Sequence, residues 1–251
     1  MNSKGNDSTL FHQGLHERLG LNTSVKKYHA MVDIETGGHP PNGAILEVAA
    51  VGFHPTDPSS VGPVYYAGIS RESNEEHGLT IDDDTRSFWE TQPRYEEVFG
   101  GKRNIADVLS EIDAFLAPFK KVWSKSPIFD MGLIRDAMLA TGYCGRSRNH
   151  WSFTNRRRFR DVRTALDVAR RNRRINQEDY GLEWPYDRCH HPIADCLKQI
   201  GDLYESKWAG PFIPLTAISR PIPLDVVKLW RQINELENPN VGLSGFLTTV
   251  T

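Results

Sequence analysis

The stretch Tyr28-His-Ala-Met-Val-Asp-Ile-Glu-Thr-Gly-Gly38 decides how this chain folds. Its apolar run, Ala30 to Val32, is typical of a buried strand, and Asp33 and Glu35 follow at the end of that run. Side chains two positions apart on a strand point to the same face. The two carboxylates are therefore predicted to lie side by side.

Two neighbouring acids at the end of a strand suggest a metal site. Buried carboxylates are costly unless they are paired or bound to a metal, and oxygen ligands of this kind suit a hard divalent cation. A lone Asp-x-Glu is more often a strand that ends in polar surface residues. The rest of the chain must decide between these alternatives.

The composition is that of a globular protein. The chain has 251 residues, 39% of them hydrophobic and 25% charged, which allows one large or two small domains with a substantial core. Three cysteines without close pairing argue against a disulfide framework. The first 27 residues lack the apolar core of a signal peptide, and no run approaches the length of a membrane span. A cytoplasmic protein without membrane contact is expected.

Hydrophobic patterning predicts an α/β domain with a central mixed sheet flanked by helices. Turn clusters separate the first three strands, which form an antiparallel meander and are expected near residues 28–33, 44–53 and 64–69. A short strand is expected at 121–124 and an edge strand at 151–153. Amphipathic or capped helices are expected at 82–92, 104–119 (cap Asn104), 127–141, 161–170 (cap Asp161) and 192–207.

The chain divides into three parts. Residues 1–27 are polar and are predicted to form a flexible tail, and residues 28–208 hold the predicted domain. Residues 209–251 form a C-terminal extension that is proline-rich at its start, has one predicted helix at 225–236, and ends in an apolar, uncharged stretch. This extension is the candidate surface for forming a homo-oligomer.

Two later segments offer residues that can join the first acidic pair. Asp130 follows Phe129 where a predicted helix begins, although an acid in a first helical turn is commonly a surface residue favoured by the helix dipole. Pro192 marks the start of another helix, so His190 lies in the preceding loop and Asp195 in the first turns. A surface helix with a capping histidine is the alternative.

In this order and spacing, the residues resemble the three motifs of the DEDDh (DnaQ-like) 3′–5′ exonucleases. The motifs are Asp-x-Glu on a first strand, Phe-Asp at a helix start and His-x4-Asp on a late helix. The resemblance covers residues 28–207 and implies an RNase H-like fold. Longer phrases are similar to the exonuclease VIII-like and phage-type branch, related to a mycobacterial exoribonuclease domain, which suggests a phage-encoded protein in a bacterial host. These phrases are Asp33–Thr36, Ala44–Val51, Trp123–Asp130 and Arg160–Thr164.

The resemblance implies a metal-dependent enzyme that uses two Mg²⁺ or Mn²⁺ ions and a histidine base. Asp33, Glu35, Asp130 and Asp195 would hold the ions, and His190 would be the general base. The expected substrate is a single-stranded 3′ end of DNA, cleaved to nucleoside 5′-monophosphates. RNA ends or short oligonucleotides are the enzymatic alternative, and a non-catalytic nucleic-acid binding module is the alternative from another class.

A dense arginine block between residues 155 and 174 is predicted to contact phosphates. A solvated basic helix face is the alternative. The candidate contacts are Arg156, Arg157, Arg158, Arg160 and Arg163.

Substrate positioning is open at two further places. Phe88, Trp89 and Trp123 are able to stack on bases, although aromatic side chains more commonly belong to the core. Ser124 and Ser126 stand where the resembling family often has Asn or Gly before the second-motif Asp.

Overall fold

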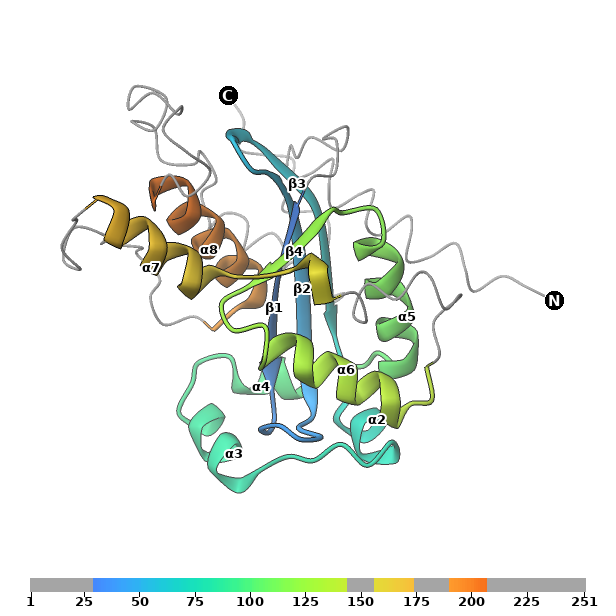
Figure 1. Cartoon of the computed structure of the whole chain (residues 1–251). Coiled ribbons are helices and arrows are strands. Elements are labelled where there is room, and N and C mark those ends of the chain that lie inside the picture. The colour runs from blue at the N-terminus through green and yellow to red at the C-terminus, as the bar shows by residue number, and fades with distance from the viewer. Residues whose placement is uncertain (1–28, 144–155, 174–189, 207–251) are drawn as a thin grey trace, which may run out of the picture.

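The computed structural model describes residues 29–143, 156–173 and 190–206 (Figure 1). The N-terminal tail, the expected edge strand at 151–153 and the whole C-terminal extension lie outside these residues. Within the described ranges, no helix is both long and apolar enough to cross a membrane.

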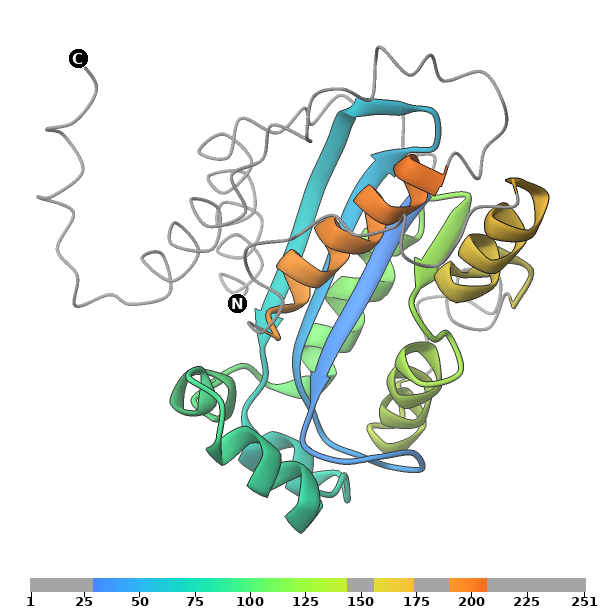
Figure 2. The same ribbon diagram turned by 90° about the vertical axis from the view of Figure 1, so that its left-hand side faces the viewer.

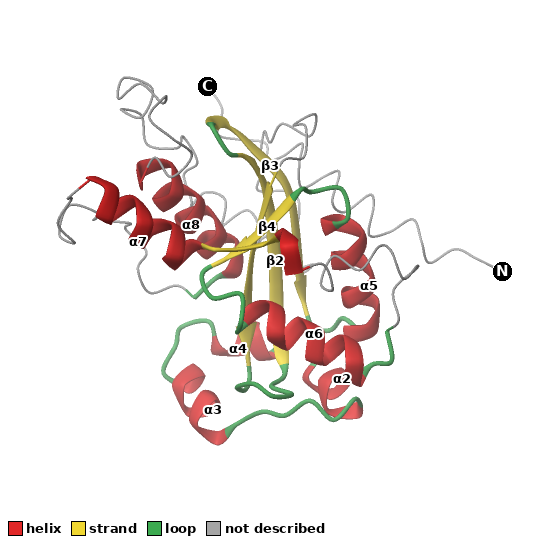
Figure 3. Cartoon of the chain, in the orientation of Figure 1, coloured by secondary structure: helices red, strands yellow, loops and turns green. Residues whose placement is uncertain are grey.

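A five-stranded sheet in the order β3-β2-β1-β4-β5 forms the centre (Figure 3). The first three strands pair antiparallel, whereas β4 is parallel to β1 and β5 is parallel to β4. The predicted mixed sheet with an antiparallel first half is confirmed. The strands are β1 (His29–Thr36), β2 (Ile45–His54), β3 (Asp57–Gly68), β4 (Lys121–Ser124) and β5 (Phe159–Asp161).

Helices cover both faces of the sheet. One core lies between the sheet, α5 and α6, and a second lies between the sheet, α7 and α8. Figure 2 shows α8 crossing the sheet in front and α5 behind it. The helices are α2 (Arg71–Glu76), α3 (Asp83–Glu90), α4 (Tyr95–Phe99), α5 (Ile105–Leu116), α6 (Asp130–Ala140), the 3₁₀ turn η1 (Arg156–Arg158), α7 (Val162–Arg173) and α8 (Pro192–Ser206).

Strand alternation in β1 decides where the acids point. Val32 and Ile34 pack into the core beneath α5 and α6, whereas Met31 packs into the core beneath α8. Asp33 and Glu35 follow Met31 at two-residue steps and so share its face. The apolar floor beneath α8 therefore continues directly into a pair of carboxylates.

Both predicted helix caps are confirmed. The side chain of Asn104 accepts a hydrogen bond from the backbone N–H of Ala106 at 2.9 Å. The carboxylate of Asp161 accepts from the backbone N–H of Arg163 and from the hydroxyl of Thr164, both at 2.9 Å. Each cap satisfies a donor that the first helical turn leaves free.

Among the described residues, the sequence does not predict the short elements α2, α4, β5 and the 3₁₀ turn η1. Helices α2 and α4 have six and five residues, too few for a periodic pattern, and β5 has three residues inside the arginine block. Two boundaries also differ from expectation. α6 begins at Asp130 because residues 127–129 form a turn, and β3 begins at Asp57, seven residues before the predicted strand.

Asn74 fixes the start of β2. Its amide donates to the carbonyl oxygens of Ile45 (2.9 Å) and Ser70 (3.0 Å), and its Oδ1 accepts from the N–H of Ile45 (3.0 Å). This side chain is fully buried. Ile45 pairs with Thr36 at the point where the β1–β2 register shifts, so Asn74 stabilises the sheet next to the acidic pair.

We expect Asn74→Ala to lower the free energy of unfolding by about 2–3 kcal/mol, because buried backbone groups lose their partners. Urea denaturation of the full chain measures this change. Glu76→Ala, an exposed substitution on the same helix, should stay within about 0.5 kcal/mol of the wild type. Equal stability of the two variants would contradict the assigned role.

Candidate active site

Three carboxylates meet at the end of β1. Ligand oxygens of Asp33, Glu35 and Asp195 all lie within 4.8 Å of one another. The first two come from one face of β1, and the third comes from the first turn of α8. The packing of α8 on the sheet thus brings together acids that are far apart in the sequence.

Asp130 lies beside this group rather than within it. It is the first residue of α6 and is only 6% exposed. Its charge is one of the influences that raise the pKa of Asp33. All four acids named from the sequence therefore lie in one region, and the ligand oxygens of three of them lie within 4.8 Å of one another.

Burial raises the pKa of every one of these acids, more than the neighbouring positive charges lower it. Burial is the largest cause for Asp33 and Glu35, whose pKa values lie well above their usual range, and the neighbouring carboxylates add to it. Burial raises the pKa of Asp130 to about 6, against hydrogen bonds from Ser124 and the backbone. The pKa of Asp195 is also raised by burial, although the charge of His190 opposes this.

The donor set fits a divalent cation. Among the described residues, no lysine or arginine forms an ion pair with these carboxylates. Buried carboxylates in such a cluster are normally paired or bound to a metal. Because every ligand is a carboxylate oxygen, the group suits Mg²⁺ or Mn²⁺ better than a metal that prefers nitrogen or sulfur.

Gln199 holds one of these acids in place. Its Nε2 donates to Oδ1 of Asp33 at 2.8 Å, and the side chain is 5% exposed. Gln199 follows Asp195 by four residues, so both lie on one face of α8. Gln199 is not among the site residues predicted from the sequence, although its position four residues after Asp195 indicates the shared helix face.

The structure separates two adjacent histidines. His190 is exposed in the loop before α8, and its ring lies edge-on to those of Phe88 (5.1 Å between centroids) and Trp89 (6.0 Å). His191 is 1% exposed and stacks on Tyr66 at 5.4 Å. Of the two, His190 is the one that solvent and substrate can reach.

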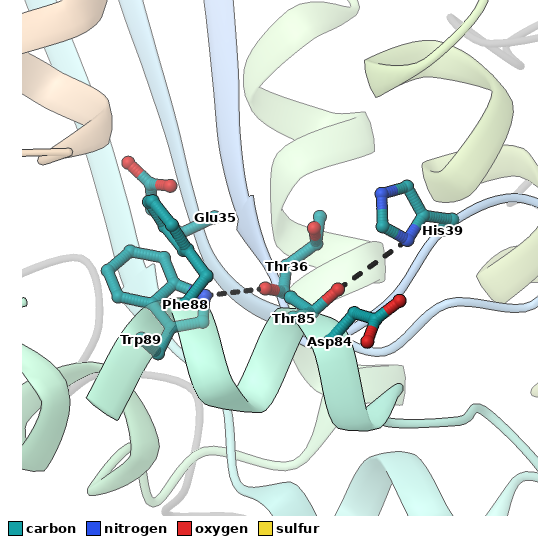
Figure 4. A pocket seen from close by; sticks show the side chains of 7 residues that line it. All are labelled: Glu35, Thr36, His39, Asp84, Thr85, Phe88 and Trp89. Atoms are coloured by element: carbon teal, nitrogen blue, oxygen red, sulfur yellow. Dashed lines mark hydrogen bonds between the residues drawn. The ribbon is translucent and has the colours of Figure 1, made fainter. Parts of the chain in front are cut away.

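A pocket of about 260 Å³ adjoins the acids (Figure 4). One wall is the end of β1 and the loop after it, and the other is α3. Its lining residues are Glu35, Thr36, His39, Asp84, Thr85, Phe88 and Trp89.

The loop after β1, which contains Gly38 and His39, is held by hydrogen bonds and close packing. Asp82 accepts from the backbone N–H of His39 (2.8 Å) and lies 2.9 Å from its Nδ1. A Cβ on Gly38 would come within 2.6 Å of the carbonyl oxygen of Thr80. The glycine is therefore required by the packing of the loop against residues 80–82.

The candidate aromatic residues divide between core and pocket. Trp123 is buried in β4 and donates to His29, and Trp89 is buried and donates to the carbonyl oxygen of Thr36 at 2.8 Å. Phe88 is 42% exposed and lines the pocket. Of the three, only Phe88 is exposed, although its ring also contacts those of Trp89 and His190.

The arginine block does not form one surface. The Arg158 guanidinium donates to the carbonyl oxygens of Leu116 (2.6 Å) and Phe119, at the end of α5. Arg160 donates to the carbonyl oxygens of Arg157 and Phe159. These two side chains bind the backbone of their own chain.

Arg163 lies at the other end of β5. It follows the strand that pairs with β4 at Ser124, it is exposed, and its charge acts on Asp130. Arg163 is thus the arginine of the predicted set that acts on the acidic cluster. The side chain of Arg156 lies outside the described part of the chain, and Arg157 is exposed.

A buried ion pair next to the acids is also not predicted from the sequence. Glu47 pairs in register with Glu35 on the neighbouring strand, and Arg94 binds Glu47 at 2.7 Å. Arg94 stands in a short polar turn, where nothing in the local sequence indicates that its side chain is buried.

The fold and these residues define a nuclease domain of the DEDDh type with an RNase H-like sheet. Residues 28–205 match the model of the 3′–5′ exoribonuclease Rv2179c-like domain. Because the match covers more than half of the chain, the chain belongs to this family of 3′–5′ exonucleases. The superfamily expected from the sequence is confirmed.

Solved structures agree on the fold. The chain is similar to exonuclease I in a structure that addresses how processivity is achieved (TM-score 0.52, 14% identity, 71% of this chain and 40% of that one). It is also similar to apo exonuclease I (TM-score 0.50, 15% identity, 71% of this chain and 42% of that one). The chain thus spans less than half the length of these enzymes. No curated protein matches it.

We expect Mg²⁺ or Mn²⁺ to raise the melting temperature of the metal-free protein, and to do so more at pH 8 than at pH 5.5. A raised carboxyl pKa means that the native state binds protons more tightly than the unfolded chain. Stability without cation is therefore lost as pH rises from about 4, the usual carboxyl value, through the Asp130 pKa of about 6 and the raised pKa values of Asp33 and Glu35.

Scanning calorimetry of the EDTA-treated chain, with and without cation, measures this effect at both pH values. Asp33→Asn should reduce the cation-induced rise, and Asp107→Asn, at an exposed position of α5, should preserve it. A melting temperature that ignores both cations would contradict the metal cluster.

We expect Arg158→Ala to change stability and Arg163→Ala to change nucleic-acid binding. Arg158→Ala should lower the free energy of unfolding by about 1–3 kcal/mol, because buried carbonyl oxygens lose a charged donor. Arg163→Ala should keep its stability but weaken binding of a single-stranded oligonucleotide, with the salt slope reduced by about 1. Urea denaturation and a salt titration of binding in EDTA distinguish them, and the reverse pattern would contradict the assignment.

Proposed function

We propose that this protein is a metal-dependent 3′–5′ exonuclease that hydrolyses the terminal phosphodiester and releases nucleoside 5′-monophosphates. The convergence of Asp33, Glu35 and Asp195 beside a pocket carries this proposal. Membership in a family of 3′–5′ exoribonuclease domains supports the reaction type and its direction.

The four acids, with Asp130 beside the other three, would hold two Mg²⁺ or Mn²⁺ ions. Such ions stabilise the charge that develops on the attacking and leaving oxygens of a phosphodiester. The protein's part is to keep four like charges together in a buried place. Gln199 serves this purpose by fixing the orientation of Asp33.

His190 is the proposed general base. It lies in a loop at the start of α8, within the electrostatic reach of Asp195. An imidazole accepts a proton from an attacking water near neutral pH. The exposed position lets the ring pass that proton to solvent after each cleavage.

The pocket beside Glu35 is the proposed place of the 3′-terminal nucleotide. The exposed ring of Phe88 offers a stacking face for the terminal base. The hydroxyl of Thr85, also on α3, and the ring of His39, on the opposite wall, supply hydrogen-bonding groups for a sugar. Arg163 would attract the backbone phosphates that follow the terminal nucleotide.

We propose RNA as the preferred polymer. The family description names exoribonucleases, whereas the sequence alone favoured single-stranded DNA ends. Sugar-facing polar groups in the pocket are the kind of contact that distinguishes a 2′-hydroxyl from hydrogen. The catalytic unit is proposed to span residues 28–208, in keeping with a family match over 28–205. Self-association through residues 209–251 stays a prediction.

We expect Asp33→Ala to abolish nucleotide release and His190→Ala to lower kcat by about 100- to 10,000-fold, the usual contribution of a general base. The full chain is incubated with 5′-labelled and 3′-labelled single strands of RNA and DNA, in Mg²⁺ and in Mn²⁺. Stepwise shortening of the 5′-labelled strand, faster for RNA, is the expected result.

Two matched variants serve as controls. Asp107→Ala and His77→Ala replace the same residue types outside the site, and both should keep wild-type rates. Full activity in Asp33→Ala or His190→Ala would overturn the assignment of roles. Tight binding of every strand without nucleotide release would favour a binding module instead.

A further inference from the structure

Arg94 is a buried arginine that joins the sheet to the loop of His190. It is 5% exposed and precedes α4. Its Nη2 donates to Glu47 (2.7 Å) and to Glu97 (2.8 Å), and its Nε donates to Glu97 (3.0 Å). Its Nη1 donates to the carbonyl oxygen of His190 at 2.5 Å. One rigid guanidinium thus ties together three segments of the chain.

The contacts to the two glutamates explain why a charge is buried here. Glu47 is 1% exposed, and Tyr66 donates to it at 2.7 Å. A buried carboxylate needs a partner, but a buried ion pair adds little net stability over apolar packing. Stability alone therefore does not account for the arginine. Its remaining contact, to the backbone of His190, is the one with a consequence for the site.

The backbone at His190 needs support from its surroundings. Its φ is +39°, in the left-handed region that residues other than glycine rarely adopt. Such conformations persist when neighbouring groups hold them. On the C-terminal side, buried His191 stacks on Tyr66 and accepts from the N–H of Ile193 at 3.2 Å. Arg94 binds the carbonyl group that joins these two histidines.

The ring of His190 is oriented by the same part of the chain. Phe88 and Trp89 on α3 lie nearly perpendicular to it, with interplanar angles of 89° and 76°. Helix α3 and the turn that holds Arg94 follow one another directly in the sequence. Residues 83–97 therefore contact both the backbone and the ring of this histidine.

We propose that Arg94 is a positioning residue for His190, holding the loop so that the imidazole faces the acidic cluster. The inference rests on the proposed role of His190 as the base. Arg94 touches neither the three converging acids nor the pocket lining. Its charge also acts on Glu35 and Asp195, so a test has to separate that influence from the effect through His190.

A double-mutant cycle tests this proposal. Full-length wild type, Arg94→Met, His190→Ala and the double variant are compared on a 5′-labelled single-stranded RNA with Mn²⁺. Arg94→Met should lower kcat about 100-fold, as expected for a displaced catalytic group, and change KM less than about threefold. In the His190→Ala background the same substitution should cost less than about threefold, because both changes remove one function.

Equal losses in both backgrounds would show a general structural role and overturn the inference, as would wild-type kcat in Arg94→Met. Full activity of His190→Ala would instead overturn the proposed base. If Arg94→Met does not fold, Arg94→Lys replaces it in the cycle, since lysine keeps a charge beside Glu47 but lacks the fork that reaches His190. The same pattern of losses is then expected.

Tyr66→Phe is the matched control. It removes a hydrogen bond to Glu47 from the same cluster and leaves the contact to His190 intact. The kcat of Tyr66→Phe should stay within about twofold of the wild type. A second measurement concerns Arg94→Met, in which the melting-temperature rise caused by Mn²⁺ should be preserved. Loss of that rise would place Arg94 in the support of the metal site, against the proposal.

Discussion

Repulsion between carboxylates that share one small, buried volume is the constraint on which the rest of the structure depends. Asp33 and Glu35 continue a strand whose earlier residues form an apolar floor, so they are buried by the same helix that covers that floor. The helix adds Asp195 to the group and Gln199 as a neutral donor. Folding thus assembles a set of oxygen donors that suits a divalent cation.

The buried ion pair between Glu47 and Arg94 is related to the acidic cluster. Glu47 lies opposite Glu35 in the sheet, and its charge would add to the repulsion if Arg94 did not bind it. The arginine that neutralises Glu47 comes from the turn between α3 and α4, and it also binds the backbone of His190. Electrostatic compensation and a contact to the start of α8 are therefore supplied by one side chain.

Local patterns in the sequence account for most of the fold. The apolar run at residues 30–32 and the capped periodic segments at Asn104 and Asp161 predict the first strand and two of the larger helices. The five acidic and histidine residues come from ordered motifs, which the family match supports at the level of the superfamily. The short elements α2, α4, η1 and β5 escape prediction, because three to six residues do not establish a period.

Long-range packing explains what the sequence does not reveal at the site. Arg94 and Glu47 have ordinary neighbours in the chain, and only the assembled sheet shows that they are buried together. The arginine block illustrates the opposite case. Its composition indicates phosphate binding, but Arg158 binds carbonyl oxygens at the end of α5, whereas the charge of Arg163 acts on Asp130. Composition does not distinguish a helix cap from a ligand contact.

The separation of 166 residues between Asp33 and Gln199 also has a consequence for folding during translation. Domains fold during synthesis from the N-terminus onward, and contacts so distant in sequence form late. A ribosome must therefore release α8 before the acids can meet. Every shorter nascent chain lacks Asp195 and Gln199, so the acidic cluster stays incomplete until translation of the domain is finished.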